Sequence, residues 1–311
     1  LEHAGHAVTV VVRTEDEARA VRAAGGVERL PEVRFSSTVH IATSITAGEV
    51  DGLILAVPAQ AVRGTVEAAG FSRDLPLLSA TKGIEHGTRL PMSGVLGSMG
   101  WSESLVAVLS GPNLAHEVAR GLPAAAVVAA ADGAQAVRWQ RAFNRPGFRV
   151  YTSTDVPGVE LAGALKNVVA IAAGAAVGLG MGANTVAAVM TRGLAEITRL
   201  GVAMGADPLT FQGLAGIGDL SVTCFSPLSR NRRFGELLAQ GRTVSDALAA
   251  IGEVAEGAST APVAVEMARR AGVEMPIAEQ VAAVVEGHLS VRDAMAGLLE
   301  REPRPERDPA L

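Results

Sequence analysis

The stretch LPLLSATKG, residues 75–83, indicates the fold class, because an apolar run ends there in a short loop that holds Thr81, Lys82 and Gly83. Similar apolar runs recur in the first 130 residues: HAVTVVV (6–12), DGLILAV (51–57), LVAVLS (105–110) and AAAVVAA (124–130). Runs of this kind, without strict polar alternation and separated by helical patterns, are typical of parallel strands covered on both faces. We therefore predict an α/β fold with a doubly wound parallel sheet, which binds its ligands where the strands end.

The pattern changes at about residue 153. Beyond it the strands stop, and apolar residues recur at helical spacing, as in NTVAAVMTRGLAEITRLGVAMG (184–205). With 311 residues, 49% of them hydrophobic, the chain has length for about two domains with a large core. We predict a dinucleotide-binding domain over 1–152, an all-helical substrate and catalytic domain over 153–300, and a disordered tail over 301–311, where charges alternate with proline.

The opening residues LEHAG read as the end of a helix that closes at Gly5, directly before a strand. In a Rossmann-like fold the first βα unit carries the glycine-rich phosphate loop, and this unit is missing from the sequence as it stands. Since Leu1 is not an initiator, we expect the numbering to begin inside a longer protein, and we expect this chain alone to bind a dinucleotide weakly or not at all. GLGMGA (178–183) imitates a dinucleotide loop but follows a helical run, which favours close-packed or flexible backbone.

Charge and composition exclude several classes of partner. A net charge of −5 argues against nucleic acid and against an anionic membrane surface. The single cysteine, Cys224, excludes an intramolecular disulfide and a zinc cluster and suits a reducing cytoplasm. The longest apolar run, 168–183, has 16 residues, which is short for a membrane span, and no signal peptide opens the sequence. We expect a cytoplasmic protein with no membrane span and no metal.

The lysines point to the chemistry. Of 27 basic residues only two, Lys82 and Lys166, are lysine. Arginine stays protonated, whereas a desolvated lysine can release a proton, so these two positions are candidates for proton transfer. The alternative is that both side chains snorkel to water. The segment LAGIGDLSVTC (214–224) predicts a glycine-flexible turn that holds Asp219, a natural partner for a buried ammonium. The alternative is an ordinary turn or N-cap aspartate.

The segment SPLSRNRRFGELL (226–238) predicts an anion site. If Ser229 caps a helix, Arg230, Arg232 and Arg233 crowd its first turn, where the helix dipole disfavours cations by a few tenths of a kcal/mol to ~1 kcal/mol each. Free N–H groups and arginines at a helix start suit a phosphate. The alternative is that the arginines face water or pair with Glu236. Together with a proton-donating lysine, the segment indicates reduction of a phosphorylated ketone.

These residues coincide with a known family: the chain resembles the bacterial NAD(P)-dependent sn-glycerol-3-phosphate dehydrogenases from residue 1 to about 300. The motifs that carry the resemblance are ATKGIE (80–85), SGPNLAHEVA (110–119), FRVYTSTDVPGVELAGALKNVVAI (148–171), TRGLAEITRLG (191–201), GLAGIGDLSVTCFSPLSRNRRFG (213–235) and VEMPI (273–277). The resemblance implies interconversion of dihydroxyacetone phosphate and sn-glycerol 3-phosphate with NADP or NAD, which supplies glycerol phosphate for phospholipid synthesis.

The resemblance also implies site residues. Lys166 would be the catalytic proton donor and acceptor at the substrate C2 oxygen, with Asp219 beside it. The residues expected to bind substrate are Lys82, Gly111, Asn113, Lys166, Asp219, Ser229, Arg230 and Asn231. Those expected to bind cofactor are Lys82, Ala115, Arg230, Val254 and Glu256, joined by Arg13, which stands where an acidic residue would select NAD and instead suits a 2′-phosphate.

Two other interpretations stay open. A related hydroxy-acid dehydrogenase would share the architecture, although the arginine cluster at 230–233 argues against a substrate that lacks phosphate. A non-catalytic ligand-binding or assembly protein that has no dinucleotide loop is the alternative from a different class. The oligomeric state is also open, with a homodimer as one possibility.

Overall fold

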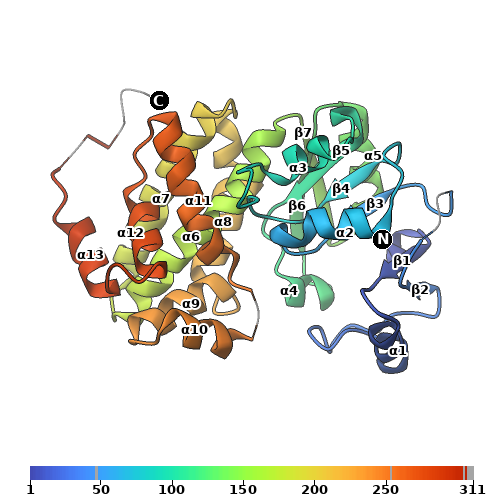
Figure 1. Ribbon diagram of the computed structural model, residues 1–311, viewed down its shortest axis with the longest axis horizontal. Coiled ribbons are helices and arrows are strands. Elements are labelled where there is room, and N and C mark those ends of the chain that lie inside the picture. The colour runs from blue at the N-terminus through green and yellow to red at the C-terminus, as the bar shows by residue number, and fades with distance from the viewer. Residues whose placement is uncertain (46–47, 253, 304, 307–311) are drawn as a thin grey trace. The chain divides into compact units, whose positions relative to one another are not determined.

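The computed structural model describes residues 1–45, 48–252, 254–303 and 305–306 (Figure 1). The expected disordered tail, 301–311, falls mostly outside these residues. The chain forms two compact units, each assembled from several segments. Unit 1 comprises 1–57, 61–81 and 93–156, and unit 2 comprises 58–60, 82–92 and 157–311.

Unit 1 is an α/β unit. Its strands are β1 (Val8–Val11), β2 (Val39–Ala42), β3 (Leu53–Leu55), β4 (Leu77–Ser79), β5 (Val106–Ser110), β6 (Ala124–Ala130) and β7 (Phe148–Ser153). Its helices are α1 (Glu15–Ala24), α2 (Val62–Ala69), α3 (Met92–Ser98), α4 (Ala115–Ala119) and α5 (Gly133–Phe143), with short 3₁₀ turns at Glu2–Ala4 and Glu103–Leu105. The first of these turns ends at Gly5 in the left-handed conformation, φ 86°, as the opening residues predict.

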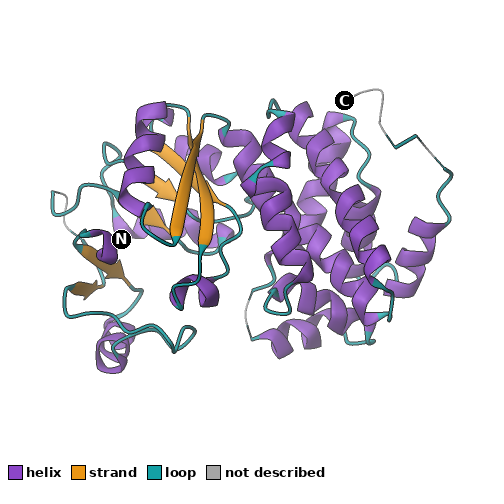
Figure 2. Ribbon diagram, turned by 180° about the vertical axis from the view of Figure 1, so that it is seen from behind, coloured by secondary structure: helices purple, strands orange, loops and turns teal. Residues whose placement is uncertain are grey.

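The strands form a five-stranded sheet in the order β3-β4-β5-β6-β7 and a separate pair, β1-β2. All pairs are parallel except β5–β6, which is antiparallel, so the prediction of a wholly parallel sheet is wrong at that pair. Residues 111–123 between these strands hold only the five-residue helix α4, which is too short to carry the chain back across the sheet. Figure 2 shows the strands of this unit in orange.

The core of unit 1 lies between the sheet and α5. Trp139 of α5 packs with Leu78, Val128 and Phe148, and all four side chains are buried. The five strands expected from apolar runs are all present, which confirms the Rossmann-like class. Strands β2 and β7 are additional to that prediction.

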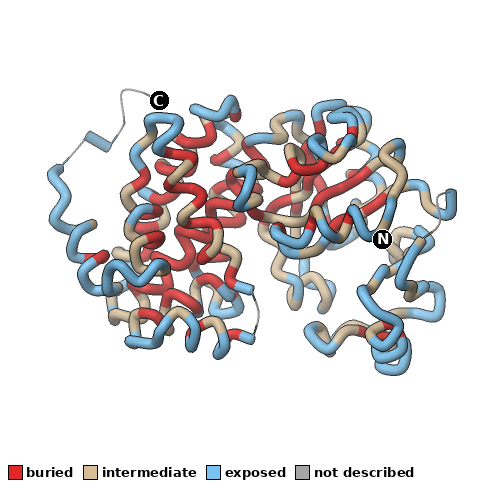
Figure 3. The backbone as a smooth tube through the Cα atoms, viewed as in Figure 1, coloured by how far each residue is buried: buried red, intermediate tan, exposed pale blue. Residues whose placement is uncertain are grey.

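Unit 2 is mainly helical in its described residues, and in its segment 82–92 an isolated antiparallel bridge pairs Ile84 with Pro91. Its helices are α6 (Val156–Gly178), α7 (Ala183–Ala203), α8 (Asp219–Phe225), α9 (Arg230–Ala239), α10 (Val244–Ile251), α11 (Glu256–Ala271), α12 (Pro276–Val285) and α13 (Val291–Leu299), with a 3₁₀ turn at Pro208–Gln212 and a π turn at Leu214–Gly218. Figure 3 shows that burial is concentrated in the central helices.

Helix α6 is the core of unit 2. It is the one helix in the described ranges that is long and apolar enough to span a membrane, but 89% of its most apolar window is buried, as expected of a core helix. The apolar run 168–183 overlaps only part of this helix, which begins at Val156, before Lys166, and ends at Gly178.

Glycines let α6 and α9 approach closely. A Cβ atom at Gly174 would lie 1.9 Å from the carbonyl oxygen of Arg232, and one at Gly235 would lie 2.0 Å from that of Ile171. A Cβ atom at Gly178 would lie 2.7 Å from the carbonyl oxygen of Glu236. Gly178 of the segment GLGMGA is therefore a packing residue, which confirms the interpretation of close-packed backbone. The arrangement brings the helix of Lys166 against the helix that starts at Arg230.

Candidate active site

Both lysines of the chain contact the same carboxylate in unit 2. Lys82 Nζ lies 2.6 Å from Asp219 Oδ2, and Lys166 Nζ lies 2.8 Å from Asp219 Oδ1. The side chains of Lys166 and Asp219 are 9% and 4% exposed, and that of Lys82 is 18% exposed. The snorkelling alternative is therefore wrong for Lys166. The cluster holds two positive charges and one negative charge, and an anionic ligand would balance it.

Burial and the neighbouring charges tune these groups. Burial, with a smaller contribution from Lys82, lowers the pKa of Lys166 to about 8 although Asp219 acts to raise it. Burial alone would raise the pKa of Asp219, but the charges of Lys82 and Lys166 outweigh it and hold that pKa below its usual value. Near neutral pH, Lys166 is thus a cation that can release its proton, beside a fixed anion.

Thr223 completes the surroundings of Lys166, and sequence reasoning missed it. Lys166 Nζ donates a hydrogen bond to Thr223 Oγ1 at 2.6 Å, and the threonine hydroxyl donates in turn to the backbone carbonyl of Asp219 at 2.6 Å. Thr223 follows Asp219 by four residues, so a helical interpretation of 219–225 would place both on one face. The sequence prediction of a flexible turn at Asp219 is wrong: Asp219 is the first residue of α8, and the glycine-rich turn precedes it.

The start of α9 is a capped helix N-terminus, as the sequence predicts. Ser229 is the N-cap residue, and its hydroxyl accepts a hydrogen bond from the Arg232 backbone N–H at 3.3 Å. The first turn contains no acidic residue. Arg232 instead follows the alternative of pairing with Glu236, because its Nε lies 2.8 Å from that carboxylate. Arg230 and Arg233 are exposed.

Asn231 links α9 to the start of α11. Its Oδ1 accepts a hydrogen bond from the Gly257 N–H at 2.9 Å. The neighbouring Glu256 is an expected cofactor residue, and burial raises the pKa of its carboxyl against the opposing effects of Arg230, Lys82 and Lys166. Val254 is exposed. The contact between Asn231 and Gly257 was not foreseen from sequence.

The remaining expected site residues belong to unit 1. Arg13 follows β1, and its exposed side chain lies 3.4 Å from the Glu17 carboxylate. Gly111 follows β5 with φ 134°, and a Cβ atom there would lie 3.0 Å from the Ala125 carbonyl oxygen, so only glycine fits. Asn113 follows in the same loop, and Ala115 begins α4. The contacts described above for the two lysines, Asp219 and Asn231 join unit 2 residues only.

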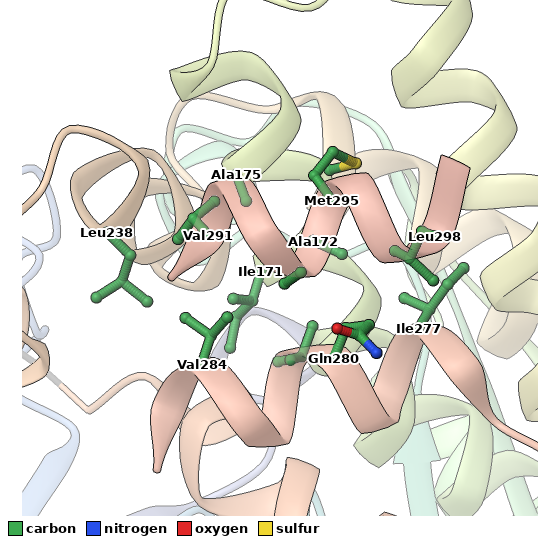
Figure 4. A pocket seen from close by; sticks show the side chains of 12 residues that line it. Ile171, Ala172, Ala175, Leu238, Ile277, Gln280, Val284, Val291, Met295 and Leu298 are labelled. Carbon is green, nitrogen blue, oxygen red and sulfur yellow. The ribbon is translucent and has the colours of Figure 1, made fainter. Parts of the chain in front are cut away.

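A separate apolar pocket lies among α6, α9, α12 and α13 (Figure 4). Gln280 is the one polar residue of its lining, which also includes Ile171, Met295 and Leu298. Because no charged group faces it, this pocket does not suit a phosphorylated substrate. Within the described ranges, no group of three His, Cys, Asp or Glu residues could hold a metal ion.

Unit 1 holds a nucleotide-type sheet, and unit 2 holds a buried lysine pair and an arginine-rich helix start. This combination is typical of the two-domain nicotinamide-dependent dehydrogenases. Residues 1–136 match the family model described as NAD-dependent glycerol-3-phosphate dehydrogenase N-terminus, and residues 155–296 match the C-terminus of the same family. The chain belongs to the NAD(P)-dependent glycerol-3-phosphate dehydrogenase family.

Individual relatives agree with this assignment. The chain is similar to glycerol-3-phosphate dehydrogenase [NAD(P)+] of Halorhodospira halophila, with 46% identity over 98% of this chain and 92% of the relative. The protein of that name from Corynebacterium glutamicum is 44% identical over 97% and 93%. Among solved structures, glycerol-3-phosphate dehydrogenase from Coxiella burnetii is similar with a TM-score of 0.90 and 34% identity, over 97% of this chain and 94% of that one.

Proposed function

We propose that the chain interconverts dihydroxyacetone phosphate and sn-glycerol 3-phosphate as an NAD(P)-dependent oxidoreductase that supplies glycerol phosphate for phospholipid synthesis. The observation that carries the proposal is the contact of both lysines with Asp219, because it gives a buried cationic centre a group able to transfer a proton. Family membership supports the substrate assignment. The bound nicotinamide supplies or accepts the hydride at C2 of the substrate.

Lys166 is the proton donor in this proposal. An ammonium group has three N–H bonds, and Asp219 and Thr223 accept two of them. The third is directed to the substrate C2 oxygen, which takes the proton as C2 gains a hydride. The neutral amine keeps its two N–H bonds on the same acceptors, so its lone pair faces the substrate and accepts the proton in the reverse direction. A pKa of about 8 allows both protonation states near neutral pH.

Asp219 and Lys82 set the electrostatics. Asp219 raises the pKa of Lys166 and so keeps it protonated for the reduction, while Lys82 opposes this effect. As the more exposed lysine, Lys82 is placed to stabilise negative charge on the substrate oxygen and to contact the cofactor. Gly111 and Asn113 of unit 1 are the further substrate contacts in the proposal.

Ser229, Arg230 and Asn231 bind the phosphate in this proposal. The backbone N–H groups at the start of α9, together with the Arg230 guanidinium, suit a phosphate dianion. Such an anion also offsets the unfavourable placement of arginines at a helix N-terminus, since no acidic residue stands in that turn.

The cofactor is NADP or NAD, held by Arg13, Lys82, Ala115, Arg230, Val254 and Glu256. Arg13 is a residue whose position fits this cofactor. It follows β1, and its side chain is 90% exposed, as a contact to a ribose 2′-phosphate requires. We expect NADPH to be accepted, because an arginine stands where an acidic residue would favour NADH.

The test of the function is NADPH oxidation, followed by absorbance, by the enzyme expressed from its whole coding sequence. We expect turnover with dihydroxyacetone phosphate and far less with dihydroxyacetone, which has the same ketone but no phosphate. Equal rates with the two ketones would favour a hydroxy-ketone reductase without a phosphate site. No turnover with either ketone would favour the non-catalytic interpretation.

Two variants test the phosphate site. Arg230→Ala should raise the KM for dihydroxyacetone phosphate about 10- to 100-fold, because a hydrogen bond to a charged group contributes roughly 1.5–3 kcal/mol. Arg233→Ala is the matched control, since it removes another exposed arginine of the same helix and should leave the KM near its original value. Equal effects of the two substitutions on the KM would mean that Arg230 contributes only positive charge and no specific contact to the phosphate.

The cellular setting is part of the proposal. A free, buried Cys224, whose thiol pKa burial raises to about 12, is suited to a reducing cytoplasm and is unreactive there. A homodimer is the oligomeric state that we propose. Light scattering of the purified enzyme tests the homodimer directly.

A further inference from the structure

Helix α11 lacks a cap of its own. The residue at its N-cap position is Ala255, and no side-chain oxygen there accepts from the helix. The first N–H groups of a helix have no partner within the helix, and leaving a buried one unpaired costs about 1–3 kcal/mol. Asn231 of α9 supplies the missing acceptor, since its Oδ1 lies 2.9 Å from the Gly257 nitrogen. The contact is buried, with Asn231 8% exposed.

The first turn of α11 is also where three segments of unit 2 meet. Gly257 lies so close to α6 that a Cβ atom would be 2.5 Å from the carbonyl oxygen of Asn167, the residue after Lys166. His86 Nε2 donates to the Ser259 carbonyl at 3.1 Å, which ties the segment that follows Lys82 to the same turn. The turn thus contacts the helix of Lys166, the segment of Lys82 and the helix of Arg230.

We propose that Asn231 is a positioning residue for this turn: its Oδ1 caps α11 from α9 and so holds Glu256 and the two lysine-bearing segments in register. The inference rests on the proposed function, which uses the other end of the same side chain. A phosphate dianion has no proton to donate and can only accept hydrogen bonds, so the Nδ2 donors of Asn231 are the part of the side chain that can bind it. The Gly257 N–H, by fixing Oδ1, also fixes where those donors point.

Substitutions can separate the two ends of the side chain. Asn231→Asp keeps an oxygen for the Gly257 N–H but replaces the donors with a charged acceptor. The KM for dihydroxyacetone phosphate should therefore rise tenfold or more, which is the effect of losing one hydrogen bond to a charged group. The kcat should change little. Asn231→Ala removes both ends. It should raise the KM similarly and also lower kcat by about tenfold or more, because a small misplacement of catalytic groups is costly.

A rescue variant completes the test. Ala255→Ser gives α11 a local N-cap, and serine is a preferred residue at that position. In the double variant Ala255→Ser/Asn231→Ala, kcat should recover while the KM stays high. Ala255→Ser alone should behave like the unsubstituted enzyme. Amide hydrogen exchange of residues 254–260 should be faster in Asn231→Ala and slow again in the double variant, which reports on the turn without using activity.

The outcomes separate the positioning role of Asn231 from the proposed function. If Asn231→Ala raises the KM but leaves both kcat and amide exchange unchanged, Asn231 serves the phosphate alone and the positioning role is wrong. The positioning role is also wrong if Asn231→Ala lowers kcat and the double variant Ala255→Ser/Asn231→Ala does not restore it. Failure of the proposed function would be visible separately, as no turnover of dihydroxyacetone phosphate by the unsubstituted enzyme. Should Asn231→Ala fold poorly, the aspartate variant and the double variant still decide the matter.

Discussion

At the scale of single residues, the use of lysine is explained by where the two lysines lie. Both contact one buried carboxylate, and one of them, Lys166, has a pKa lowered to about 8. An arginine at that position would stay charged and could not transfer a proton at neutral pH. A single aspartate between two ammonium groups also leaves the centre with a net positive charge, which suits a phosphorylated ketone whose oxygen becomes negative during reduction.

The substitution Lys166→Arg separates charge from proton transfer. We expect the variant to keep the positive charge and to bind substrate, but to lose about 10²- to 10⁴-fold in kcat, because loss of general acid catalysis has that cost. Steady-state kinetics with dihydroxyacetone phosphate measures this, with circular dichroism to show that the variant folds. Less than about a tenfold loss of kcat in a folded variant would mean that Lys166 supplies charge only.

The rate of reduction should depend on the protonation of Lys166. Since the protonated form donates, the single-turnover rate of ketone reduction should fall as pH rises through about 8, and the rate of glycerol phosphate oxidation should rise over the same interval. Asp219 raises the pKa of Lys166, so Asp219→Asn should move both midpoints to lower pH. A midpoint that moves to higher pH in this variant would contradict the pairing.

At the scale of elements, helices of unit 2 are capped by one another. Ala255 and Met275, at the N-cap positions of α11 and α12, provide no side-chain cap. Asn231 of α9 caps α11, and Glu196 of α7 caps α12 by accepting from the N–H groups of Ile277 and Ala278 at 2.8 and 3.2 Å. Capping between helices orders the bundle, because each such contact fixes one helix against another.

The buried Glu196 should make stability depend on pH. Burial raises its pKa from 4.5 to about 7, against the two backbone N–H groups and Arg199, which lower it. A raised pKa in the folded state contributes stability that is full below about pH 4.5 and is lost as pH rises through about 7. The change is on the order of 3 kcal/mol.

Glu196→Gln tests this linkage, because glutamine stays neutral. We expect the free energy of urea unfolding of the unsubstituted protein, relative to the variant, to be smaller at pH 8 than at pH 5. Glu300→Gln, at an exposed carboxylate, is the control and should show no such difference. A constant gap between Glu196→Gln and the unsubstituted protein across this interval would mean that Glu196 does not titrate there.

The close crossing of α6 and α9 should not tolerate a methyl group. Gly235→Ala would place its Cβ 2.0 Å from the Ile171 carbonyl oxygen, so the helices must separate, at a cost of about 1–3 kcal/mol of unfolding free energy. The KM for dihydroxyacetone phosphate should rise as the start of α9 moves. Gly64→Ala in α2 is the matched control, with no atom within 4 Å of the added methyl, and it should stabilise by up to ~1 kcal/mol. Equal unfolding free energies for the two variants would argue against a tight crossing.

At the scale of the whole molecule, the sequence predicts what local patterns encode. Apolar runs located five strands, and Ser229 was identified as a helix cap from its neighbours. Strand β7 was missed although Phe148 and Val150 alternate with the exposed Arg149 and Tyr151, a period-two pattern that a search for continuous apolar runs passes over. Strand β2 is short, with an exposed His40. The β5–β6 reversal and the contact between Asn231 and Gly257 depend on tertiary packing, which no local pattern contains.

A chain with only two lysines, both on Asp219, has a spectroscopic consequence. Isotope-labelled lysine, incorporated during expression, would label these two side chains alone among residues 1–311. Each side-chain resonance would then be assignable by a single substitution, and the protonation of the catalytic centre could be followed directly by magnetic resonance.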